Sequence, residues 1–248
     1  MAGTADRTPR RCSRFLPRGL TILYEDDDIL VVDKPAGLLT IATEREKART
    51  AYYALTDYVR KGNPRSRKRL FIVHRLDRET SGVLVFAKTE DAKFRLQNRW
   101  DEASKHYLAL VHGRVERPSG TITSYLAENR AHLVYSTNDA TAGKPSTTAY
   151  RVLRQTEWFS LLEVDLLTGR KHQIRVHLAE IGHPVVGDDK YGRPGGSRGR
   201  QAPRKSLRRA DRLALHAKSI SFPHPVSGEQ LTFEAPLPQI FERFFRRT

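Results

Sequence analysis

Short strand-like runs outnumber helical segments in this chain of 248 residues, and the two kinds do not alternate regularly. Two apolar runs that flank an acidic turn, 20–24 and 29–32, predict a β-hairpin. The other predicted strands are 70–73, 83–87, 106–115, 147–153, 159–167, 213–222 and 231–235. Predicted helices cover 50–61, the segment from the capping residue Thr89 to about 101, and 170–182, which Gly182 ends. Because regular β-α-β alternation is missing, we expect an α+β fold on a mixed, mainly antiparallel sheet flanked by helices, and not a doubly wound sheet.

The charge balance favours a polyanionic partner. The chain has 44 Lys and Arg against 28 Asp and Glu, a formal net charge of +16 and a pI of about 10.3. Nucleic acid is the commonest partner of this kind, and an anionic membrane surface is the alternative. No apolar run approaches the ~18 residues that span a bilayer, and no secretory signal is recognisable. Cys12 stands alone, which excludes a disulfide framework and a thiolate zinc site, so we expect a reducing cytoplasm.

Two basic segments lie outside the strand and helix pattern. Residues 1–18 carry five arginines and are expected to be a disordered tail, with an organellar targeting peptide as the alternative. Residues 193–212 hold eight Lys or Arg against one Asp and are expected to be a mobile insertion. Both are candidates for contacts with the phosphates of a nucleic acid, although a charge run can also be a solvated surface. We expect the remainder, 19–248, to form a single domain.

The stretch HRLDRETSGVLVFAKT, residues 74–89, places one aspartate, Asp77, among charged residues just before a strand. Ser81-Gly82 predicts a tight turn ahead of the apolar run. Asp77 is therefore either an ordinary turn carboxylate in a salt-bridge cluster or a reactive group on a rigid frame. In a second segment, GRKHQIRVH, residues 169–177, Arg175 lies near the boundary between the buried and wet faces of a helix. A guanidinium at such a boundary can hold a carboxylate and lower its pKa.

Metal and nucleotide motifs are missing from the sequence. His172 and His177 are five positions apart, whereas two imidazoles that bind one ion from a helix are four apart. The sequence has no HExxH motif, no P-loop and no GxGxxG motif. We therefore expect no metal at the site and neither ATP nor dinucleotide chemistry.

Six ordered elements resemble the RluA family of RNA pseudouridine synthases. The stretch 74–89 is similar to the family signature, H-R-L-D, two variable residues, T-S-G and an apolar strand that ends in A-K. The other five matching elements are ILYEDDDILVVDKPAG, KHYLALVHG, KPSTTAYRVL, LLTGRKHQIRVHLAEIGHPVVGDDKYG and RLALHAKSISFPHPVSG. They span residues 21 to about 236 in the family's order. About twenty residues precede the first hairpin, so we expect no S4-like RNA-binding domain.

The resemblance implies a pseudouridine synthase fold with a central catalytic cleft, and it implies roles for three residues. Asp77 would be the catalytic aspartate, Tyr107 would stack on the flipped base and is the candidate for removing the C5 proton, and Arg175 would pair with the aspartate. Proposals for the family differ on whether the aspartate adds to the sugar C1′, attacks the base or deprotonates C2′. All three remain open here.

The expected substrate-binding residues are Arg75, Ile174, His74 and Arg170. Ile174 would pack against Tyr107, and Arg75 would enter the RNA stack where the base has left. For His74, a hydrogen bond within the loop is favoured over proton transfer. The resemblance further implies a cytoplasmic, monomeric isomerase of rRNA or tRNA that needs no cofactor. The alternatives are a non-catalytic RNA-binding or ribosome-assembly factor and, less favoured, a membrane-surface protein.

Overall fold

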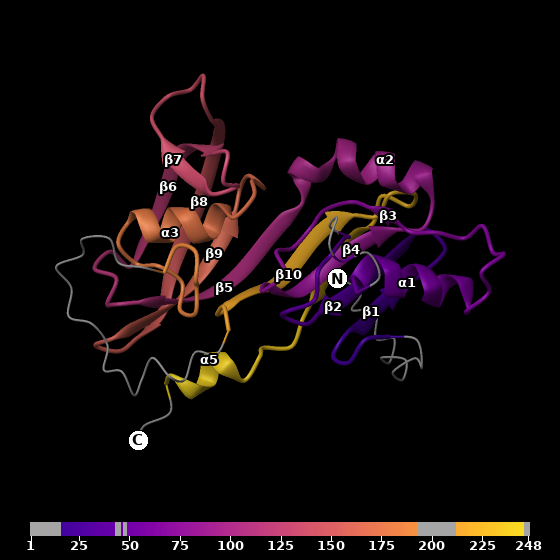
Figure 1. Ribbon diagram of the computed structural model, residues 1–248, viewed down its shortest axis with the longest axis horizontal. Coiled ribbons are helices and arrows are strands. Elements are labelled where there is room, and N and C mark those ends of the chain that lie inside the picture. Colours follow the sequence, from indigo (N-terminus) through magenta and orange to yellow (C-terminus); the bar gives the residue numbers. More distant parts are fainter. Residues whose placement is uncertain (1–15, 43–45, 47–48, 193–211, 246–248) are drawn as a thin grey trace. The chain divides into compact units, whose positions relative to one another are not determined.

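The structure, a computed structural model, describes residues 16–42, 46, 49–192 and 212–245, and the chain folds as two compact units (Figure 1). Unit 1 comprises Met1–Ala103 and Ser221–Ala235, and unit 2 comprises Ser104–Ile220 and Pro236–Thr248. Most of the expected tail and nearly all of the expected insertion lie outside the described residues. The expectation of a single catalytic domain over 19–248 stays a prediction.

Unit 1 is built around two apolar strands. Its elements are, in chain order, β1 (Thr21–Glu25), β2 (Ile29–Lys34), α1 (Ala51–Arg60), β3 (Phe71–Ile72), β4 (Ser81–Ala87), α2 (Glu90–Asn98), the 3-10 helix η1 (Trp100–Glu102) and β11 (Gln230–Glu234). Strand β2 lies between β1 and β4, and β3 also pairs with β4. The paired residues Leu30 and Phe86, like Val32 and Leu84, are fully buried. The core of unit 1 therefore lies at the β2–β4 pair.

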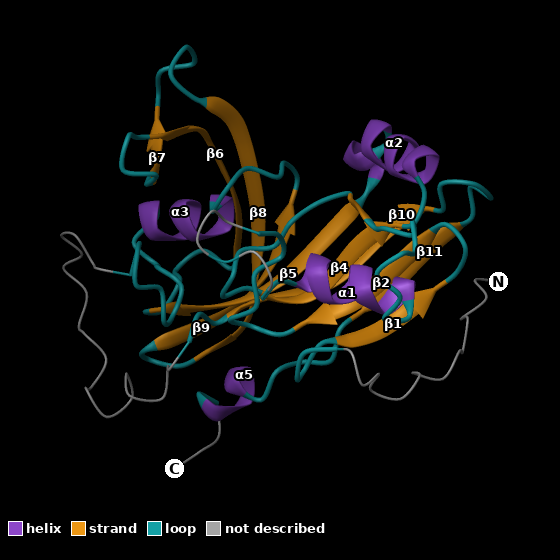
Figure 2. Ribbon diagram, turned by 45° about the vertical axis from the view of Figure 1, so that its right-hand side comes forward, coloured by secondary structure: helices purple, strands orange, loops and turns teal. Residues whose placement is uncertain are grey.

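Unit 2 is a longer antiparallel sheet with a helix on it. Its elements are β5 (Ser104–His112), β6 (Ser119–Glu128), β7 (Val134–Thr137), β8 (Lys144–Gln155), β9 (Phe159–Leu166), α3 (Gln173–Glu180) and α5 (Ile240–Arg243). The strand order is β5-β9-β8-β6-β7. Strand β10 (Leu215–Pro223) begins in unit 2 and ends in unit 1. Figure 2 shows α3 against the sheet, where it contacts β7 and β8.

The α+β class predicted from the sequence is confirmed. The strand pairs whose register is described are antiparallel, and few helices accompany them. Local signals placed most elements correctly: the Thr89 hydroxyl accepts a hydrogen bond from the Ala92 amide at the start of α2, and Gly182, at φ +84°, follows the end of α3. Among the described residues, no helix has the length and apolar character to cross a bilayer.

One helix boundary was predicted wrongly. The helix expected over 170–182 begins only at Gln173, because His172 adopts a left-handed conformation at φ 55°. A non-glycine residue in this region interrupts a right-handed helix. The His172 Nδ1 atom lies 2.8 Å from the Tyr191 hydroxyl, which also accepts a hydrogen bond from the Val134 amide. These contacts hold the chain in the turn that precedes α3.

Candidate active site

Asp77 lies in unit 1, in the loop that connects β3 to β4. It is half-buried, and it is preceded by buried Leu76 and followed by exposed Arg78. The Thr80 amide donates a hydrogen bond of 3.2 Å to the Asp77 carbonyl, which closes a turn over residues 77–80. The turn delivers the chain into β4, whose second residue, Gly82, has a φ of +113° that favours glycine. The Asp77 carboxylate is therefore presented from a tight loop at the start of a buried strand.

The backbone before Asp77 is fixed by one buried hydroxyl. Thr40 Oγ1 donates to the Leu76 carbonyl at 2.8 Å and accepts from the Leu76 amide at 3.2 Å. The hydroxyl thus satisfies both backbone groups of one residue, as a neighbouring strand would do. The Thr40 carbonyl in turn accepts from the Tyr52 amide in the first turn of α1. The loop is tied through Thr40 to the start of this helix.

The backbone after Asp77 is fixed by a buried lysine. Lys34 is fully buried, and its Nζ atom donates to the carbonyls of Pro35 at 3.0 Å, Leu38 at 2.8 Å and Arg78 at 3.1 Å. The Gly37 amide donates to the same Arg78 carbonyl at 2.9 Å. Segment 34–40 therefore holds the chain on both sides of Asp77. We call this set of contacts, made by Lys34, Gly37 and Thr40 to Leu76 and Arg78, the loop clamp.

The sequence analysis missed the loop clamp. Around Asp77 it considered only the neighbouring charged residues, the tight turn at Ser81-Gly82 and the apolar run that follows. The signal was a lysine two residues after the apolar run ILVV, where burial of the adjoining residues requires the ammonium to find acceptors. Two of the acceptors, on Pro35 and Leu38, are local, whereas the third, on Arg78, lies 44 residues further along the chain.

The charged neighbours of Asp77 have structural partners. His74 accepts a hydrogen bond at Nε2 from the Val85 amide of β4 at 3.0 Å, and its ring lies 4.9 Å from that of Trp100. This bond joins the loop to β4, so the hydrogen bond within the loop that was favoured for His74 stays a prediction. Arg78 Nε lies 3.7 Å from Glu79 and also donates to the Gly37 carbonyl at 3.2 Å. Arg75 is exposed.

Replacing Lys34 with methionine should lower the free energy of unfolding by about 2–3 kcal/mol at pH 7, because three carbonyl oxygens lose their donor.

The effect should also depend on pH. Burial lowers the pKa of the Lys34 ammonium to about 7, although the negative charges of Glu79, Asp77 and Asp33 act to raise it. The pKa of an unfolded lysine is about 10.4. Between pH 7 and 10 the unfolded chain thus binds a proton that the folded chain releases. Lys34 therefore makes stability rise with pH in this window, by at most about 1.4 kcal/mol per pH unit.

Urea unfolding of the wild-type and Lys34→Met proteins at pH 7, 8 and 9 measures both effects. The gap between the two proteins should widen as the pH rises. Lys88→Met is the matched control, because Lys88 is partly exposed, forms an ion pair of 3.1 Å with Glu25 and contacts the Asp26 carbonyl in the same unit. Its loss should lower stability by about 1 kcal/mol or less. Equal losses in the two variants would contradict the assignment of Lys34 to the loop clamp.

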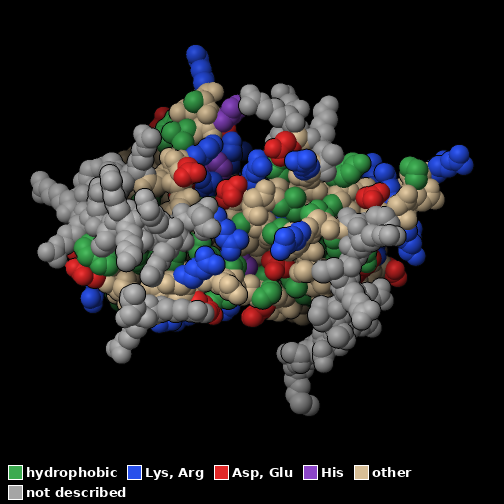
Figure 3. All heavy atoms as spheres, turned by 60° about the horizontal axis from the view of Figure 1, so that its bottom comes forward, with side chains coloured by type: hydrophobic (Ala, Val, Ile, Leu, Met, Phe, Trp, Pro, Cys, Tyr) green, Lys and Arg blue, Asp and Glu red, His purple; other side chains and the backbone are tan. Residues whose placement is uncertain are grey.

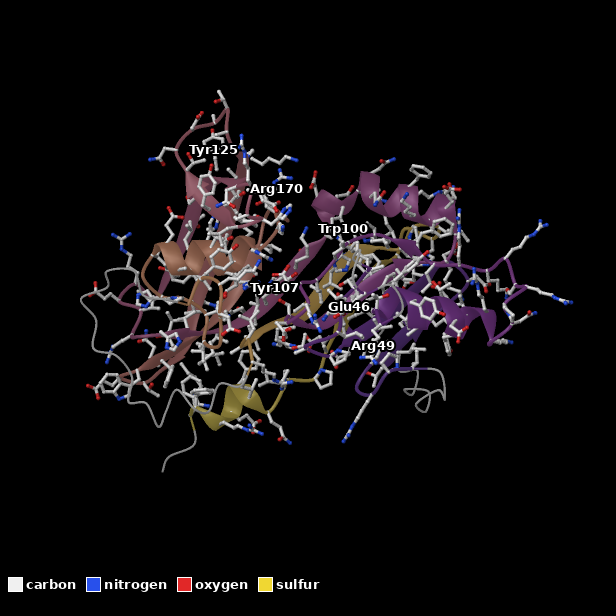
Figure 4. All side chains as sticks on the ribbon, viewed as in Figure 1. Glu46, Arg49, Trp100, Tyr107, Tyr125 and Arg170 are labelled. Carbon is white, nitrogen blue, oxygen red and sulfur yellow. The ribbon has the colours of Figure 1, made fainter. Side chains whose placement is uncertain are left out.

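Two of the predicted site residues are buried in unit 2. Tyr107 lies on β5, where it pairs with Val164 of β9, and about 8% of its surface is exposed. Ile174, in the first turn of α3, is buried as well. Figure 4 labels Tyr107 on its strand, together with Tyr125 and Arg170 of the same unit.

Arg175 has a carboxylate partner that the sequence analysis did not consider. Its Nε and Nη2 atoms donate to the two carboxylate oxygens of Asp188, at 2.7 and 2.8 Å. The Asp188 side chain is fully buried, and one of its oxygens also accepts from the amides of Lys190 and Tyr191, each at 3.0 Å. The Arg175 guanidinium carbon lies 5.1 Å from the centre of the Tyr191 ring. Asp188 therefore fixes the direction in which the guanidinium points.

A buried polar network seats the start of α3 on the sheet. The Gln173 amide donates to the Thr147 carbonyl and the Thr148 hydroxyl, each at 2.9 Å, and its oxygen accepts from the Arg170 amide at 3.0 Å. His177 contacts the hydroxyls of Thr148 and Ser124 at 2.9 and 3.1 Å. Burial lowers the pKa of His177 to about 4, so the imidazole is neutral at pH 7. The network positions the backbone of both Arg170 and Arg175.

Arg170 itself is exposed, and its Nε donates to the Pro145 carbonyl at 3.3 Å. Pro145 pairs in register with Tyr125 of β6. Arg170 and Tyr125 therefore both lie next to Pro145 (Figure 4). Guanidinium and aromatic groups on one surface commonly contact nucleic-acid phosphates and bases.

One cluster in unit 1 has the composition of a metal site. Ligand atoms of Asp26, Asp28 and His224 lie within 4.8 Å of one another. The His224 Nδ1 atom accepts from the amides of Val226 and Ser227 at 3.3 and 3.1 Å, so the proton of the neutral ring is on Nε2. Nε2 then donates to Asp26 at 3.1 Å. Both ring nitrogens are used within the protein, which does not fit a metal ligand.

The predicted site residues come from both units. Asp77, Arg75 and His74 belong to unit 1, whereas Tyr107, Arg170, Ile174 and Arg175 belong to unit 2. The pairing of Arg175 with Asp77 and the packing of Ile174 on Tyr107 stay predictions. Each unit fixes its own charged group with buried partners: the loop clamp holds the backbone around Asp77, and Asp188 holds Arg175.

Comparisons with known proteins show which family the chain belongs to. A family model described as RNA pseudouridylate synthase matches residues 28–180. The chain is 38% identical over 244 residues to "Ribosomal large subunit pseudouridine synthase D" of Nitrosomonas europaea, which covers 96% of this chain and 67% of that protein. It is 39% identical over 233 residues to the protein of the same name from Salmonella typhimurium, with 89% of this chain and 68% of that protein covered.

Two solved human structures are similar in fold. "Human RNA Pseudouridylate Synthase Domain Containing 1" has a TM-score of 0.66 at 30% identity and covers 88% of this chain and 83% of that one. "Human RNA Pseudouridylate Synthase Domain Containing 4" has a TM-score of 0.72 at 24% identity, over 90% of this chain and 91% of that one, and bears on the fold alone. The family match and the curated relatives together show that the chain belongs to the RNA pseudouridylate synthase family and is an isomerase that converts uridine to pseudouridine in RNA.

Proposed function

We propose that the enzyme modifies specific uridines in ribosomal RNA of the large subunit, and that Asp77 is its catalytic group. The observation that carries the proposal is the loop clamp, which holds the residues on both sides of this aspartate. A carboxylate on a rigid frame in the signature motif of the family is suited to act at one bond of a bound nucleotide. The choice of RNA is supported by the names of relatives that are 38–39% identical to this chain.

The chemistry requires no oxidant and no net hydrolysis. The N1–C1′ bond breaks, the uracil turns, C5 bonds to C1′, the C5 proton leaves and N1 gains a proton. The heavy atoms of the substrate are all kept and the proton lost from C5 is balanced by the one gained at N1, so the reaction can proceed without a cofactor. The Asp77 carboxylate acts where charge develops as the glycosidic bond breaks, as a nucleophile or as an electrostatic stabiliser.

Arg175 is the proposed counter-ion of Asp77. Asp188 uses the Nε and Nη2 groups of the guanidinium, and Nη1 is the group that we assign to the Asp77 carboxylate. An arginine keeps its charge at any pH near neutrality, so it would pair with the negative charge of the Asp77 carboxylate. Asp188 would then be a positioning residue that aims this charge.

Base flipping is part of the proposal. Extraction of the uridine from the RNA stack costs a few kcal/mol. Stacking of the extruded uracil on the Tyr107 ring contributes about 1–3 kcal/mol, and the remainder comes from phosphate contacts with Lys and Arg. Ile174 would form a wall of the pocket, and Arg75, His74 and Arg170 would contact the RNA. We assign the reaction to the cytoplasm, where the lone thiol of Cys12 stays reduced.

The proposal is tested by mapping pseudouridine after incubation with unmodified RNA. Large-subunit rRNA, small-subunit rRNA and bulk tRNA are incubated separately with the protein, and pseudouridine is located by carbodiimide modification followed by primer extension. We expect new stops at a small number of positions in the large-subunit RNA alone. Modification confined to tRNA would overturn the choice of substrate, and unmodified RNA in all three reactions would overturn the proposed activity.

A further inference from the structure

A loop of unit 1 carries the highest density of positive charge in the described part of the chain. The loop joins α1 to β3 and has the sequence RKGNPRSRKR, residues 60–69, with six Lys or Arg in ten residues. No Asp or Glu occurs between Asp57 and Asp77. We call this segment the basic loop. In Figure 1 it leaves the end of α1 and extends away from the strands of unit 1.

The basic loop is folded by its own hydrogen bonds. Lys61, at φ 54°, ends α1, and its amide donates to the Tyr58 carbonyl at 2.9 Å. The Asn63 side chain accepts from the Arg65 amide at 3.0 Å. Arg60 Nε donates to the Lys68 carbonyl at 2.8 Å and so joins the two ends of the loop. The loop therefore displays its charges from a fixed backbone, which reduces the conformational entropy lost when a ligand binds.

Four exposed cations of the basic loop differ in their pairing from three exposed arginines elsewhere. Those three have carboxylate partners at 2.6–2.8 Å, in the pairs Arg95–Asp91, Arg99–Glu102 and Arg151–Glu163. Within the described residues, no carboxylate oxygen lies within 4 Å of the side-chain nitrogens of Lys61, Arg65, Arg67 and Lys68. Figure 3 shows acidic and basic side chains interspersed over the face that it presents. The basic loop has no such local compensation.

The positive charges of the basic loop favour the phosphate backbone of a nucleic acid as its ligand. Clustered cations that lack carboxylate partners gain free energy by replacing the counterions condensed on a nucleic acid. Residues 61–69 include no Leu, Ile, Val, Phe or Trp that could enter the acyl region of a membrane. We propose that the basic loop is an RNA-docking element that binds phosphates of the substrate RNA away from the reacting uridine. This inference rests on the proposed function.

The length of chain between the basic loop and Asp77 limits how far the loop can lie from the candidate catalytic residue. Asp77 follows Arg69 by eight positions in the chain, which fully extended span at most roughly 26–29 Å. Phosphates bound at this end of the loop would thus lie close enough to Asp77 to belong to the RNA molecule that carries the target. The loop is expected to affect affinity and to leave the chemical step alone.

Two triple variants of the full-length chain test the proposal. Arg65, Arg67 and Lys68 are changed to glutamine in the test variant, and Arg95, Arg99 and Arg151 in the control. Both variants lose three positive charges, so they have the same net charge. Arg60 and Arg69 are kept, because Arg60 closes the loop and Arg69 lies 4.8 Å from the Phe71 ring. Thermal unfolding checks that both variants are folded.

Binding to large-subunit rRNA is measured from 50 to 300 mM KCl, together with the single-turnover rate at saturating protein. We expect the test variant to bind at least tenfold more weakly. Its plot of log affinity against log salt should be shallower by about 2, since each lost phosphate contact removes about 0.7–0.9. Its saturated rate should stay within twofold of wild type. The control should bind within twofold of wild type.

Equal weakening in both variants would show that only net charge matters and would overturn the proposal, as would unchanged binding by the test variant. Vesicles with 30% phosphatidylserine form a separate arm: loss of vesicle binding with unchanged RNA binding would assign the loop to a membrane instead. The proposed function fails separately, if wild type forms no pseudouridine in any RNA, because the binding comparison needs no turnover.

Discussion

Asp77→Asn should abolish pseudouridine formation, with a rate below about a thousandth of wild type, because loss of a group that acts at the reacting bond typically lowers the rate by roughly that factor or more. Asparagine has nearly the same size and lacks the negative charge. The backbone on both sides of Asp77 is held by Thr40 and Lys34. We therefore expect the variant to fold and to bind RNA with nearly wild-type affinity.

Release of tritium from RNA labelled at uridine C5 measures the reaction directly, since this proton leaves when C5 bonds to the sugar. Glu79→Gln is the matched control. Glu79 is exposed, lies in the same turn and, like Asp77, contributes a negative charge that opposes the lowering of the Lys34 pKa. Both variants thus remove one carboxylate and alter the electrostatics at Lys34 in the same direction.

The control should keep activity within about threefold of wild type. If Asp77→Asn also retained activity in this range, the carboxylate would have no chemical role. If instead the two variants lost activity together, the effect would come from the charge around Lys34 and the loop clamp. Asp77→Glu adds a third comparison: it restores the charge but moves it by one methylene, so a large loss in this variant shows that position matters as well as charge.

The sequence predicted those parts of the fold that local signals determine. The β1–β2 hairpin follows from two apolar runs around an acidic turn, and α2 follows from Thr89 as its cap. Strands β6 and β7 were not predicted. In β6 few residues are buried, and serine and threonine occupy much of the strand, so the apolar alternation that marks a strand is weak. These strands are specified mainly by pairing with β8 and with each other.

The candidate site was predicted through motif order, and its supporting contacts were not. Asp77, Tyr107 and Arg175 could be named because each lies in a recognisable stretch. The contact between Thr40 and Leu76 joins residues 36 positions apart, and that between Lys34 and Arg78 joins residues 44 apart. Both contacts join a side chain to a backbone group. Every residue has a backbone carbonyl, so the type of residue that carries the acceptor does not reveal the contact.

The same reasoning applies to Arg175. The sequence analysis assigned it to Asp77 alone, although Asp188 is only 13 residues further along the chain. The stretch GDDKYG contains two aspartates, and spacing alone does not show which of them faces α3. The turn over residues 188–192 determines which aspartate faces α3. The Gly192 amide donates to the Asp188 carbonyl at 2.8 Å, and a Cβ atom at Gly192 would lie only 2.0 Å from that oxygen. Glycine at this position permits the turn in which Asp188 points inward.

Asp188→Asn should lower the free energy of unfolding by about 3–5 kcal/mol, the range expected when one partner of a buried ion pair is removed. The amide that replaces one carboxylate oxygen would direct N–H groups toward the N–H groups of Arg175.

The stabilisation by Asp188 should depend on pH. Burial acts to raise the pKa of Asp188. The hydrogen bond and charge of Arg175, together with the amides of Tyr191 and Lys190, have a larger effect and hold this pKa below its usual value. The unfolded carboxyl therefore binds its proton first as the pH falls. The contribution of Asp188 is present above about pH 4 and is lost below it.

Glu163→Gln is the control that shows whether the burial of an ion pair or its short distance determines how much the pair stabilises the fold. Glu163 accepts from Arg151 in the same unit at 2.6 Å, which is shorter than either contact between Arg175 and Asp188. Arg151 is 65% exposed, however, and solvent screens this pair, so its loss should lower stability by less than about 1 kcal/mol. Urea unfolding at pH 7 and at pH 3 distinguishes the variants. At pH 7 Asp188→Asn should be far less stable than Glu163→Gln. At pH 3 its deficit relative to wild type should shrink, because the unfolded wild-type chain then binds a proton at Asp188 and is stabilised relative to the folded chain. A deficit that stays the same at both pH values would show that the shape of the turn, and not the ion pair, is what Asp188 contributes.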